Sequence, residues 1–336
     1  MGEQKQVPGC KLTQHTMDGH CVLTLENDAI RVSIDVDHGA HLFEMTDKRT
    51  NIDVMYKDPK GLSYDVGGWY ELFPNAGTGC SYKGSDVPGH GDVQHLPWTF
   101  MIEQESEEEI RVHLRTESKV RPFALEKTVA LKKGQASLHI AEKITNLSGE
   151  AEPYLWGHHV TFGAPFVSPY SRIDLPGCRV FDQPDYHPNN SRLLSGASGT
   201  LDRMPGKRGE KVDNTYFAAE PFNEMLFIDE LQEHWYNVFN EQAGLGFALA
   251  WDGVVFPYLW LWQEHHSEQE EPFGGQLYAM ALEPQASNAP TLSKAVSKGQ
   301  APVLEAGQSA ETWLTVVMHA NRDRVKSVNR EGGLTF

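Results

Sequence analysis

Three sequence motifs carry side chains that exchange protons near neutral pH. His90 lies between two glycines, which leave its imidazole unobstructed. His158 and His159 are adjacent, so on a strand they face opposite sides of a sheet and cannot chelate one metal ion from the same face. Glu283 follows the apolar run 279–282, and a buried carboxylate is costly unless it has a partner or a task. Carboxyl and imidazole groups, with ordinary pKa values of ~4.3 and ~6.5, suit general acid–base catalysis.

An aromatic segment precedes Glu283 in the chain. Trp260 and Trp262 alternate with leucine in the run 258–263, so on a strand they share one face. Such a face usually belongs to a core. It also suits the apolar face of a sugar ring, because aromatic rings offer flat, polarizable area with a polar edge. We expect Trp260 or Trp262 to lie in or beside a cleft. The other of the two can belong to the core instead.

Short strands must position these motifs. Apolar and polar residues alternate in 30–36, 110–115, 138–140 and 314–318, and Gly, Asn and Asp turns stand between such segments. The best helical signal, 290–299, is short, with Pro at its start and Gly at its end. No strand alternates with a long helix, which disfavours a doubly wound fold. The pattern predicts an all-β protein, a large antiparallel β-sandwich, with residues 1–336 forming a single domain.

Composition excludes several classes of protein. The chain has 29 Lys and Arg against 46 Asp and Glu, a net charge of −17, which disfavours binding to nucleic acid or to an anionic membrane. Four cysteines without CxxC spacing predict neither a disulfide scaffold nor a thiolate zinc site. No signal sequence and no apolar run of ~20 residues are found, so we expect a cytoplasmic protein. P-loop, GxSxG, HExxH and dinucleotide motifs are also missing.

Taken in order, the motifs resemble the aldose 1-epimerase (galactose mutarotase-like) family. The similarity extends from about residue 20 to 320 and is carried by the motifs Phe-Pro-Asn at 73–75, Pro-Gly-His-Gly at 88–91, Trp-Gly-His-His at 156–159 and Leu-Glu-Pro-Gln at 282–285. The resemblance implies a large antiparallel sandwich with its site in a cleft across one sheet. It also implies that His90 hydrogen-bonds the sugar near its ring oxygen, that His159 is the general acid and that Glu283 is the general base.

The implied reaction interconverts the α and β anomers of a sugar by opening and reclosing its ring. It needs a sugar substrate but no metal and no organic cofactor. The candidate substrate-binding residues are Asn75, Gln94, His158, Trp260, Trp262 and Gln263. Gln94 stands where the hexose-6-phosphate type of this family has Arg, and no Arg occurs between Arg49 and Arg111. Because a phosphate clamp prefers Arg, we expect a free, unphosphorylated monosaccharide. The sequence leaves the particular sugar and the oligomeric state open.

Two alternatives remain at this stage. The same sandwich could hold a carbohydrate without converting it, as a non-catalytic binding module. It could also be an isomerase or lyase that acts on a modified sugar. Glu283 distinguishes the first alternative, because a lectin needs no base paired with an imidazole across an anomeric carbon.

Overall fold

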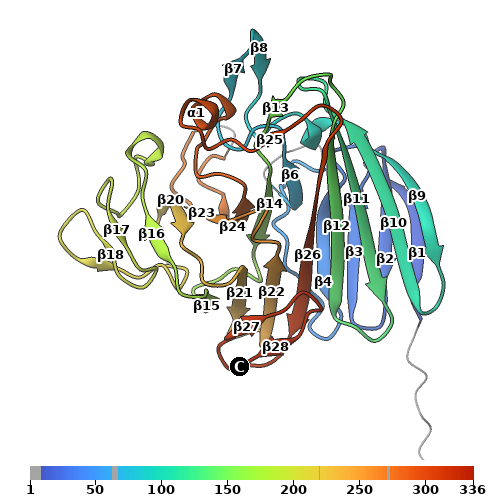
Figure 1. Ribbon diagram of the computed structural model, residues 1–336. Coiled ribbons are helices and arrows are strands. Elements are labelled where there is room, and N and C mark those ends of the chain that lie inside the picture. The colour runs from blue at the N-terminus through green and yellow to red at the C-terminus, as the bar shows by residue number, and fades with distance from the viewer. Residues whose placement is uncertain (1–8, 63–66, 219, 271–272) are drawn as a thin grey trace, which may run out of the picture.

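Two large antiparallel sheets pack face to face in the computed structural model, which describes residues 9–62, 67–218, 220–270 and 273–336 (Figure 1). The larger sheet has 12 strands in the order β1-β2-β3-β4-β6-β14-β24-β23-β20-β16-β17, with β5 paired to β4. The smaller has 8 strands in the order β15-β21-β22-β26-β12-β11-β10-β9. The predicted all-β antiparallel sandwich is confirmed.

The strands of the larger sheet are β1 (Lys11–Met17), β2 (His20–Glu26), β3 (Ile30–Asp35), β4 (His41–Asp47), β5 (Ile52–Asp53), β6 (Trp69–Leu72), β14 (Gly157–Gly163), β16 (Arg179–Phe181), β17 (Ser198–Gly199), β20 (Phe222–Asp229), β23 (Tyr258–His265) and β24 (Tyr278–Gln285). Those of the smaller sheet are β9 (Thr99–Glu105), β10 (Glu109–Glu117), β11 (Phe123–Lys132), β12 (Ser137–Asn146), β15 (Ser171–Asp174), β21 (Trp235–Asn240), β22 (Leu245–Trp251) and β26 (Ser309–His319).

Short pairs of strands decorate the two sheets. They are β7 (Cys80–Tyr82) with β8 (Ser85–Val87), β13 (Glu152–Pro153) with β25 (Val303–Leu304), β18 (Met204–Pro205) with β19 (Lys211–Val212), and β27 (Ser327–Val328) with β28 (Leu334–Thr335). The helical elements are η1 (Val93–His95), η2 (Pro184–Tyr186) and α1 (Leu292–Ser297). No helix in the described residues is long and apolar enough to span a bilayer. All four cysteines are free.

The predicted alternation appears where the sheets face each other. Ile110, Val112 and Leu114 are fully buried on β10, whereas the residues between them are partly exposed. The other alternating segments lie in β3, β12 and β26. Because side chains on a strand alternate between faces, each sheet directs one apolar face into the shared core. The main core cluster draws residues from both sheets.

The predicted helix at 290–299 is also confirmed, as α1. Thr291 caps its first turn, accepting a hydrogen bond at Oγ1 from the Lys294 amide at 3.2 Å. Gly299 follows with a φ of 66°, a conformation that favours glycine. In Figure 1, α1 lies beside the β7–β8 hairpin at one end of the larger sheet.

Asn75 connects the loop that leads to His90 with the start of α1. Its Nδ2 donates to the carbonyl oxygens of Thr78, at 2.8 Å, and Pro88, at 2.9 Å. Its Oδ1 accepts a hydrogen bond from the Leu292 amide at 2.8 Å. One fully buried amide therefore joins both ends of the loop that leads to His90 and anchors the start of α1. The sequence predicted that Asn75 binds substrate, but its polar atoms are engaged in these internal contacts.

We predict that Asn75→Ala lowers the free energy of unfolding by about 1–3 kcal/mol, because it leaves buried backbone groups without partners. Urea unfolding followed by tryptophan fluorescence measures the change. Asn189→Ala, at an exposed asparagine, is the control and should change stability by less than about 0.5 kcal/mol. Equal stability of the two variants would show that the contacts of Asn75 do not stabilise the loop.

Candidate active site

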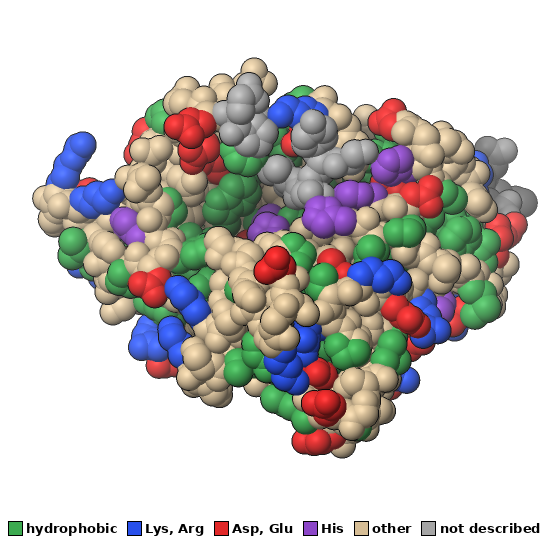
Figure 2. Space-filling view, turned by 90° about the horizontal axis from the view of Figure 1, so that it is seen from above, with side chains coloured by type: hydrophobic (Ala, Val, Ile, Leu, Met, Phe, Trp, Pro, Cys, Tyr) green, Lys and Arg blue, Asp and Glu red, His purple; other side chains and the backbone are tan. Residues whose placement is uncertain are grey.

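A pocket of about 350 Å³ opens on the face of the larger sheet that points away from the main core. Strands β6, β14, β24, β23 and β20 form its floor, and Figure 2 shows hydrophobic side chains lining a hollow with histidine at its edge. Its walls are made by Tyr70, Gly77, His90, His159, Tyr186, Pro188, Asn223, Met225, Trp260, Trp262, Phe273 and Glu283. The structure therefore brings together the three predicted catalytic residues and both predicted tryptophans.

Strand register places four of these residues in one row across the floor. Tyr70 on β6 is directly opposite His159 on β14. The pairs Gly157–Gln285 and Val160–Leu282 then set His159 beside Glu283 on β24. Glu283 in turn is opposite Trp260 on β23. Because directly opposed residues share a face, the row Tyr70–His159–Glu283–Trp260 presents its side chains to the pocket.

Proline usually ends regular strand pairing, but Pro284 does not end its strand. It lies within β24, opposite Leu259 of β23. On the other side, however, no register pair joins β24 to β14 at His158 or His159. Proline has no amide hydrogen for the ladder, which accounts for the local loss of pairing there. The interruption falls at the point where His159 meets Glu283.

His159 and Glu283 form the centre of the pocket. His159 Nε2 lies 3.6 Å from Glu283 Oε1. The other ring nitrogen, Nδ1, is 2.8 Å from Thr161 Oγ1, which fixes the plane of the ring. Tyr70 stacks on this imidazole, with ring centroids 5.0 Å apart and an interplanar angle of 3°. His159 is 6% exposed and Glu283 is 3% exposed, so both groups reach the pocket with little access to bulk water.

Gln285 holds the second carboxyl oxygen of Glu283. Its Nε2 donates to Glu283 Oε2 at 3.1 Å. A Cβ at position 157 would collide with the Gln285 side-chain amide, so Gly157 leaves the space that this amide needs. Two elements of the predicted motifs, the glycine of Trp-Gly-His-His and the glutamine of Leu-Glu-Pro-Gln, therefore act together to orient the carboxyl group.

Burial shifts both proton-transfer groups toward their neutral forms. Desolvation raises the pKa of Glu283 to about 8, against a smaller lowering by the Gln285 hydrogen bond. Desolvation, followed by the nearby His90 and His41, holds the pKa of His159 well below its usual 6.5. Near pH 7 the ligand-free pair therefore consists of a carboxylic acid and a neutral imidazole. The resemblance had implied the opposite starting state, an ionised Glu283 and a protonated His159.

His90 enters the pocket from a tight turn. Its φ is 60°, in the left-handed region that few non-glycine residues occupy. A Cβ at position 91 would overlap the Phe73 carbonyl, so Gly91 allows the turn to approach β6 closely. The His90 ring lies 5.4 Å from that of His159, and its Nδ1 is 3.5 Å from Tyr70 Oη. The predicted role of the flanking glycines matches this geometry.

The two tryptophans lie in the pocket wall in different ways. Trp260 is 1% exposed, and its Nε1 donates to Asn288 Oδ1 at 3.0 Å, so it forms a fixed part of the floor. Trp262 is only partly buried, and its ring lies 6.1 Å from that of His159. Trp262 therefore offers ring surface to a ligand, whereas Trp260 supports it.

Three further predicted binding residues lie outside the pocket, in addition to Asn75. His158 is fully buried and points to the opposite side of β14, as the alternation of strand side chains requires. Gln263 is fully buried for the same reason, because it follows Trp262 on β23. Gln94 lies in η1, and its side-chain amide is 3.1 Å from His95 Nε2. Neither glutamine nor His158 lines the cleft.

Sequence reasoning missed several wall residues, including Tyr70, Tyr186, Asn223 and Met225. Tyr70 lies just before the Phe-Pro-Asn motif at 73–75, so it could have been found there. Tyr186 comes from a long loop that carried no chemical signal, and burial followed by the charge of Glu283 raises the pKa of Tyr186 to about 12. It therefore keeps its hydroxyl proton near neutral pH. Asn223 and Met225 lie on β20, and only strand order brings them to the site.

No lysine or arginine lines the described part of the pocket. The two cations at Tyr82 on the β7–β8 hairpin, Lys83 and Arg121, have partners of their own. Arg121 forms a buried ion pair with Glu152. Lys83 Nζ lies 3.1 Å from the same carboxylate. The described part of the pocket wall thus supplies no cation to neutralise a phosphate or carboxylate on a ligand.

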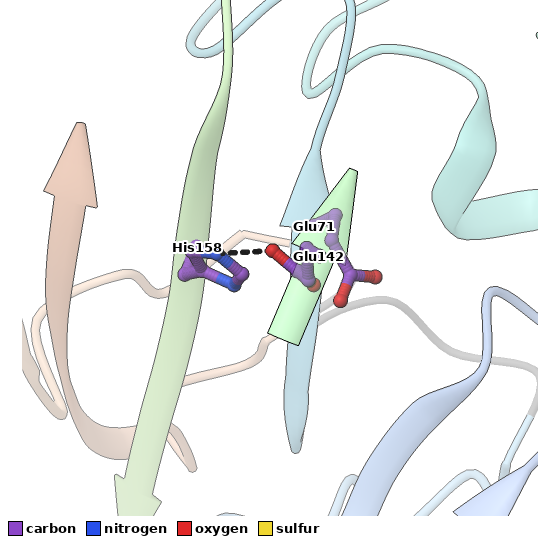
Figure 3. A group of neighbouring side chains, drawn as sticks. All are labelled: Glu71, Glu142 and His158. Carbon is purple, nitrogen blue, oxygen red and sulfur yellow. Dashed lines mark ion pairs between the residues drawn. The ribbon is translucent and has the colours of Figure 1, made fainter. Parts of the chain in front are cut away.

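A second polar group lies between the sheets, behind the row of pocket residues. Glu71, Glu142 and His158 place one potential metal-ligating atom each within 4.8 Å of one another (Figure 3). His158 Nδ1 accepts a hydrogen bond from Trp69 Nε1 at 3.1 Å, so its proton is on Nε2, 3.1 Å from Glu142 Oε2. The group was not predicted, because its members come from three separate strands.

Lys127 accounts for the charge of this group. Its Nζ lies 2.6 Å from Glu71 Oε1 and donates to the Ala40 carbonyl at 3.1 Å. Desolvation, as the largest cause, raises the pKa of Glu71 and of Glu142 to about 7. One ammonium and one proton shared by the two carboxyls make the group neutral. A divalent cation would add positive charge beside a buried ammonium, so these residues do not fit a metal ion well.

We predict that Glu142→Gln becomes more stable relative to the wild type as pH rises from 5 to 8. A folded-state pKa above the unfolded value of 4.5 stabilises the protein fully below about pH 4.5, and this stability is lost as pH rises through about 7. The amide cannot ionise and escapes that loss. Melting temperatures at both pH values measure the difference between variant and wild type.

Glu126→Gln, on the neighbouring strand β11 and partly exposed, is the matched control. Its melting temperature should differ from the wild type by the same amount at pH 5 and pH 8. A pH-independent difference for Glu142→Gln as well would mean that this carboxyl does not hold a proton in the folded protein.

Comparisons with known proteins identify the family and the fold of the chain. The model of a family described as a domain of unknown function, DUF4432, matches residues 68–318. No curated protein sequence matches. Among solved structures, a candidate aldose 1-epimerase from Klebsiella pneumoniae superimposes with a TM-score of 0.69 at 17% identity, covering 92% of this chain and 87% of that one.

Two further structures agree with this similarity. A galactose mutarotase-like protein from Clostridium acetobutylicum has a TM-score of 0.67 at 17% identity, covering 93% and 99% of the two chains. A galactose mutarotase-related enzyme from Lactobacillus acidophilus has a TM-score of 0.61 at 18% identity, covering 90% and 99%. The TM-scores establish the shared fold, as the sequence motifs had indicated. The chain belongs to the DUF4432 family and has the galactose mutarotase-like fold.

Proposed function

We propose that the protein is an aldose 1-epimerase that interconverts the α and β anomers of an uncharged sugar. The observation that carries the proposal is the pairing of His159 with Glu283, 3.6 Å apart, in a pocket with aromatic walls. Two groups with opposite proton-transfer roles lie side by side, as an anomeric centre requires. The fold shared with aldose 1-epimerase-like structures supports the same reaction.

The reaction needs one proton removed from the C1 hydroxyl and one delivered to the ring oxygen. The C1–ring-oxygen bond then breaks and C1 becomes an aldehyde carbon. After rotation about the C1–C2 bond, the ring oxygen attacks the other face of the aldehyde and both proton transfers reverse. His159 and Glu283 make these transfers, and His90 hydrogen-bonds the sugar. Residues at hydrogen-bond distance from both oxygens can each contribute roughly 10²–10⁴-fold.

The pKa shifts in the pocket indicate that the transferable proton is on Glu283 before the reaction begins. With Glu283 as a carboxylic acid and His159 neutral, Glu283 delivers a proton to the ring oxygen and His159 Nε2 takes the C1 proton. In this state His159 Nδ1–H donates to Thr161 Oγ1. The resemblance had implied the reverse roles. Either distribution holds one transferable proton, and ring closure on the opposite face uses the two groups in the reverse sense.

The absence of cations from the described pocket wall supports an unphosphorylated substrate. Buried anionic groups require partners, and Glu283 would repel a second negative charge whenever it is ionised. Tyr186 and Asn223 supply neutral hydrogen-bonding groups instead. The chemistry of the wall therefore fits a polyhydroxylated, neutral ligand.

We predict that Glu283→Gln lowers kcat about 10²–10⁴-fold while the dissociation constant of the sugar changes little, because the amide keeps the shape but transfers no proton. His159→Asn should act similarly. Polarimetry on pure anomers of a panel of neutral aldoses, corrected for spontaneous mutarotation, measures the rate. Isothermal titration measures binding.

Glu103→Gln makes the same carboxyl-to-amide exchange at an exposed position and should leave kcat unchanged. Wild-type turnover by Glu283→Gln would overturn the mechanism. Sugar binding without any turnover by the wild type would instead identify a non-catalytic carbohydrate-binding protein.

The pH dependence of kcat/KM should be bell-shaped. Activity requires one proton on the pair. It therefore falls at low pH, where His159 becomes protonated below its usual pKa, and falls above about pH 8, where Glu283 ionises. The profile is measured with the same corrected polarimetric assay. A rate that stays constant from pH 7 to pH 9.5 would exclude Glu283 as the proton donor in the free enzyme.

A further inference from the structure

Tyr186 brings into the pocket a hydroxyl group that the two proposed proton transfers do not use. It lies in the short helix η2, between β16 and β17, whereas His159 and Glu283 lie on strands of the pocket floor. Its side chain is partly exposed and lines the same cavity. No hydrogen bond to another described residue engages its hydroxyl. The hydroxyl is therefore available to a ligand.

Aromatic packing fixes the ring that carries this hydroxyl. The Tyr186 ring packs edge to face on Phe227, with centroids 6.1 Å apart and an interplanar angle of 73°. Phe227 packs in the same way on Trp260, with centroids 5.0 Å apart at 67°. All three rings contribute to a hydrophobic cluster separate from the main core. The phenol is thus held in place before a ligand binds, which lowers the entropy that binding costs.

A hydrogen-bonded link joins the backbone of η2 to the same part of the floor. Gln183, which precedes η2, donates from Nε2 to the Asn288 carbonyl at 2.6 Å. The side chain of Asn288 accepts a hydrogen bond from Trp260 Nε1 at 3.0 Å. Both the ring of Tyr186 and the backbone that carries it are therefore anchored at Trp260, which is directly opposite Glu283 in the sheet.

The hydroxyl of Tyr186 lies between Gly77 and the acid group of the site. A Cβ at position 77 would lie 2.9 Å from Tyr186 Oη, so Gly77 leaves the space beside the hydroxyl open. After desolvation, the charge of Glu283 is the second cause that raises the pKa of Tyr186, so the two groups are within electrostatic reach of each other. An uncharged donor that keeps its proton thus accompanies Glu283 in the cavity.

The proposed reaction needs such a donor. As His159 removes the C1 proton, negative charge builds on the C1 oxygen, which then becomes the aldehyde oxygen. Glu283 delivers its own proton to the ring oxygen, so it cannot donate to the C1 oxygen at the same time. The two oxygens are bonded to the same carbon, and a donor close to Glu283 is therefore close to both. A donor fixed in advance stabilises developing charge without reorganisation.

We propose that Tyr186 is a further catalytic residue, whose hydroxyl donates a hydrogen bond to the C1 oxygen as this atom becomes the aldehyde oxygen. The inference rests on the proposed function, because it assigns a role within that reaction. Tyr186 keeps its proton throughout and adds no proton transfer to those of His159 and Glu283.

The test combines Tyr186→Phe with sugars that lack the C1 hydroxyl. The variant loses the hydroxyl but keeps the ring that packs on Phe227. Each aldose of the polarimetric panel is paired with its 1,5-anhydro derivative, as glucose is with 1,5-anhydroglucitol and galactose with 1,5-anhydrogalactitol. We expect kcat to fall about 10²-fold, as for other donors to a developing oxyanion. By titration calorimetry, affinity for the aldose should fall about three- to tenfold, and affinity for the anhydro sugar should stay unchanged.

Tyr170→Phe removes a hydroxyl from a 56% exposed tyrosine outside the described pocket lining, and this control should match the wild type in every measurement. Unchanged affinity of Tyr186→Phe for the anhydro sugar also shows that its pocket is intact. Wild-type kcat in Tyr186→Phe, or equal losses of affinity for both sugars, would overturn this inference and leave the epimerase proposal standing. A loss confined to the aldose, without turnover of any sugar by the wild type, would support the contact with the C1 oxygen and overturn the epimerase. Binding of no sugar in the panel would overturn both.

Discussion

The register of β14 against its two neighbours is the constraint on which the site depends. His158 and His159 are adjacent, so their two faces are exchanged if the strand slips by one residue. In the observed register His159 meets Tyr70 and Glu283, and His158 meets Glu71. A slip would turn His158 to the pocket face and His159 to the face between the sheets. The fully buried pattern of β14 gives this register a large energetic basis.

The two faces of this strand carry polar groups that solve the same physical problem differently. Between the sheets, Lys127 and a shared proton neutralise Glu71 and Glu142, so the charges are satisfied within the protein. On the pocket side, Gln285 and the neighbouring His159 are the partners of Glu283 among the described residues, and burial keeps its proton in place. A carboxyl group kept protonated by desolvation next to a neutral imidazole is poised to exchange a proton with a ligand. The group around Lys127 is neutralised within the protein, whereas Glu283 and His159 can exchange a proton with a bound ligand.

The fold and the centre of the site could be predicted from the sequence, because both depend on local sequence patterns. Period-2 alternation predicted β3, β10, β12 and β26, and Pro and Gly marked α1. Motifs around His90, His159 and Glu283 identified three residues that do lie together. Binding roles for Asn75, Gln94 and Gln263 were inferred from polar residues in or near the motifs, and none of the three lines the pocket.

A polar residue in a motif can serve a ligand or a backbone, and spacing alone does not separate these uses. The side-chain amide of Asn75, for example, forms three hydrogen bonds with backbone groups. Met225 and Asn223 were missed for the converse reason. They enter the site through the order of β23 and β20 in the sheet, which is a property of long-range pairing and not of local sequence. The buried group around Lys127 was beyond reach for the same reason.

The segment that matches the family model contains the whole described lining of the pocket. Residues 68–318 begin immediately before β6 and include every residue placed here in the pocket, from Tyr70 to Glu283. Strands β1 to β5 lie outside that segment. They extend the larger sheet away from the pocket and cover the apolar face of the smaller one (Figure 1).

Among the contacts that cross this division, His41 on β4 stacks on Tyr70 with ring centroids 4.6 Å apart. Tyr70 is thus held between an imidazole from the supporting strands and the imidazole of His159. The N-terminal strands therefore complete the core and also fix one wall of the site. The residues that line the described pocket all lie within the segment that the family shares.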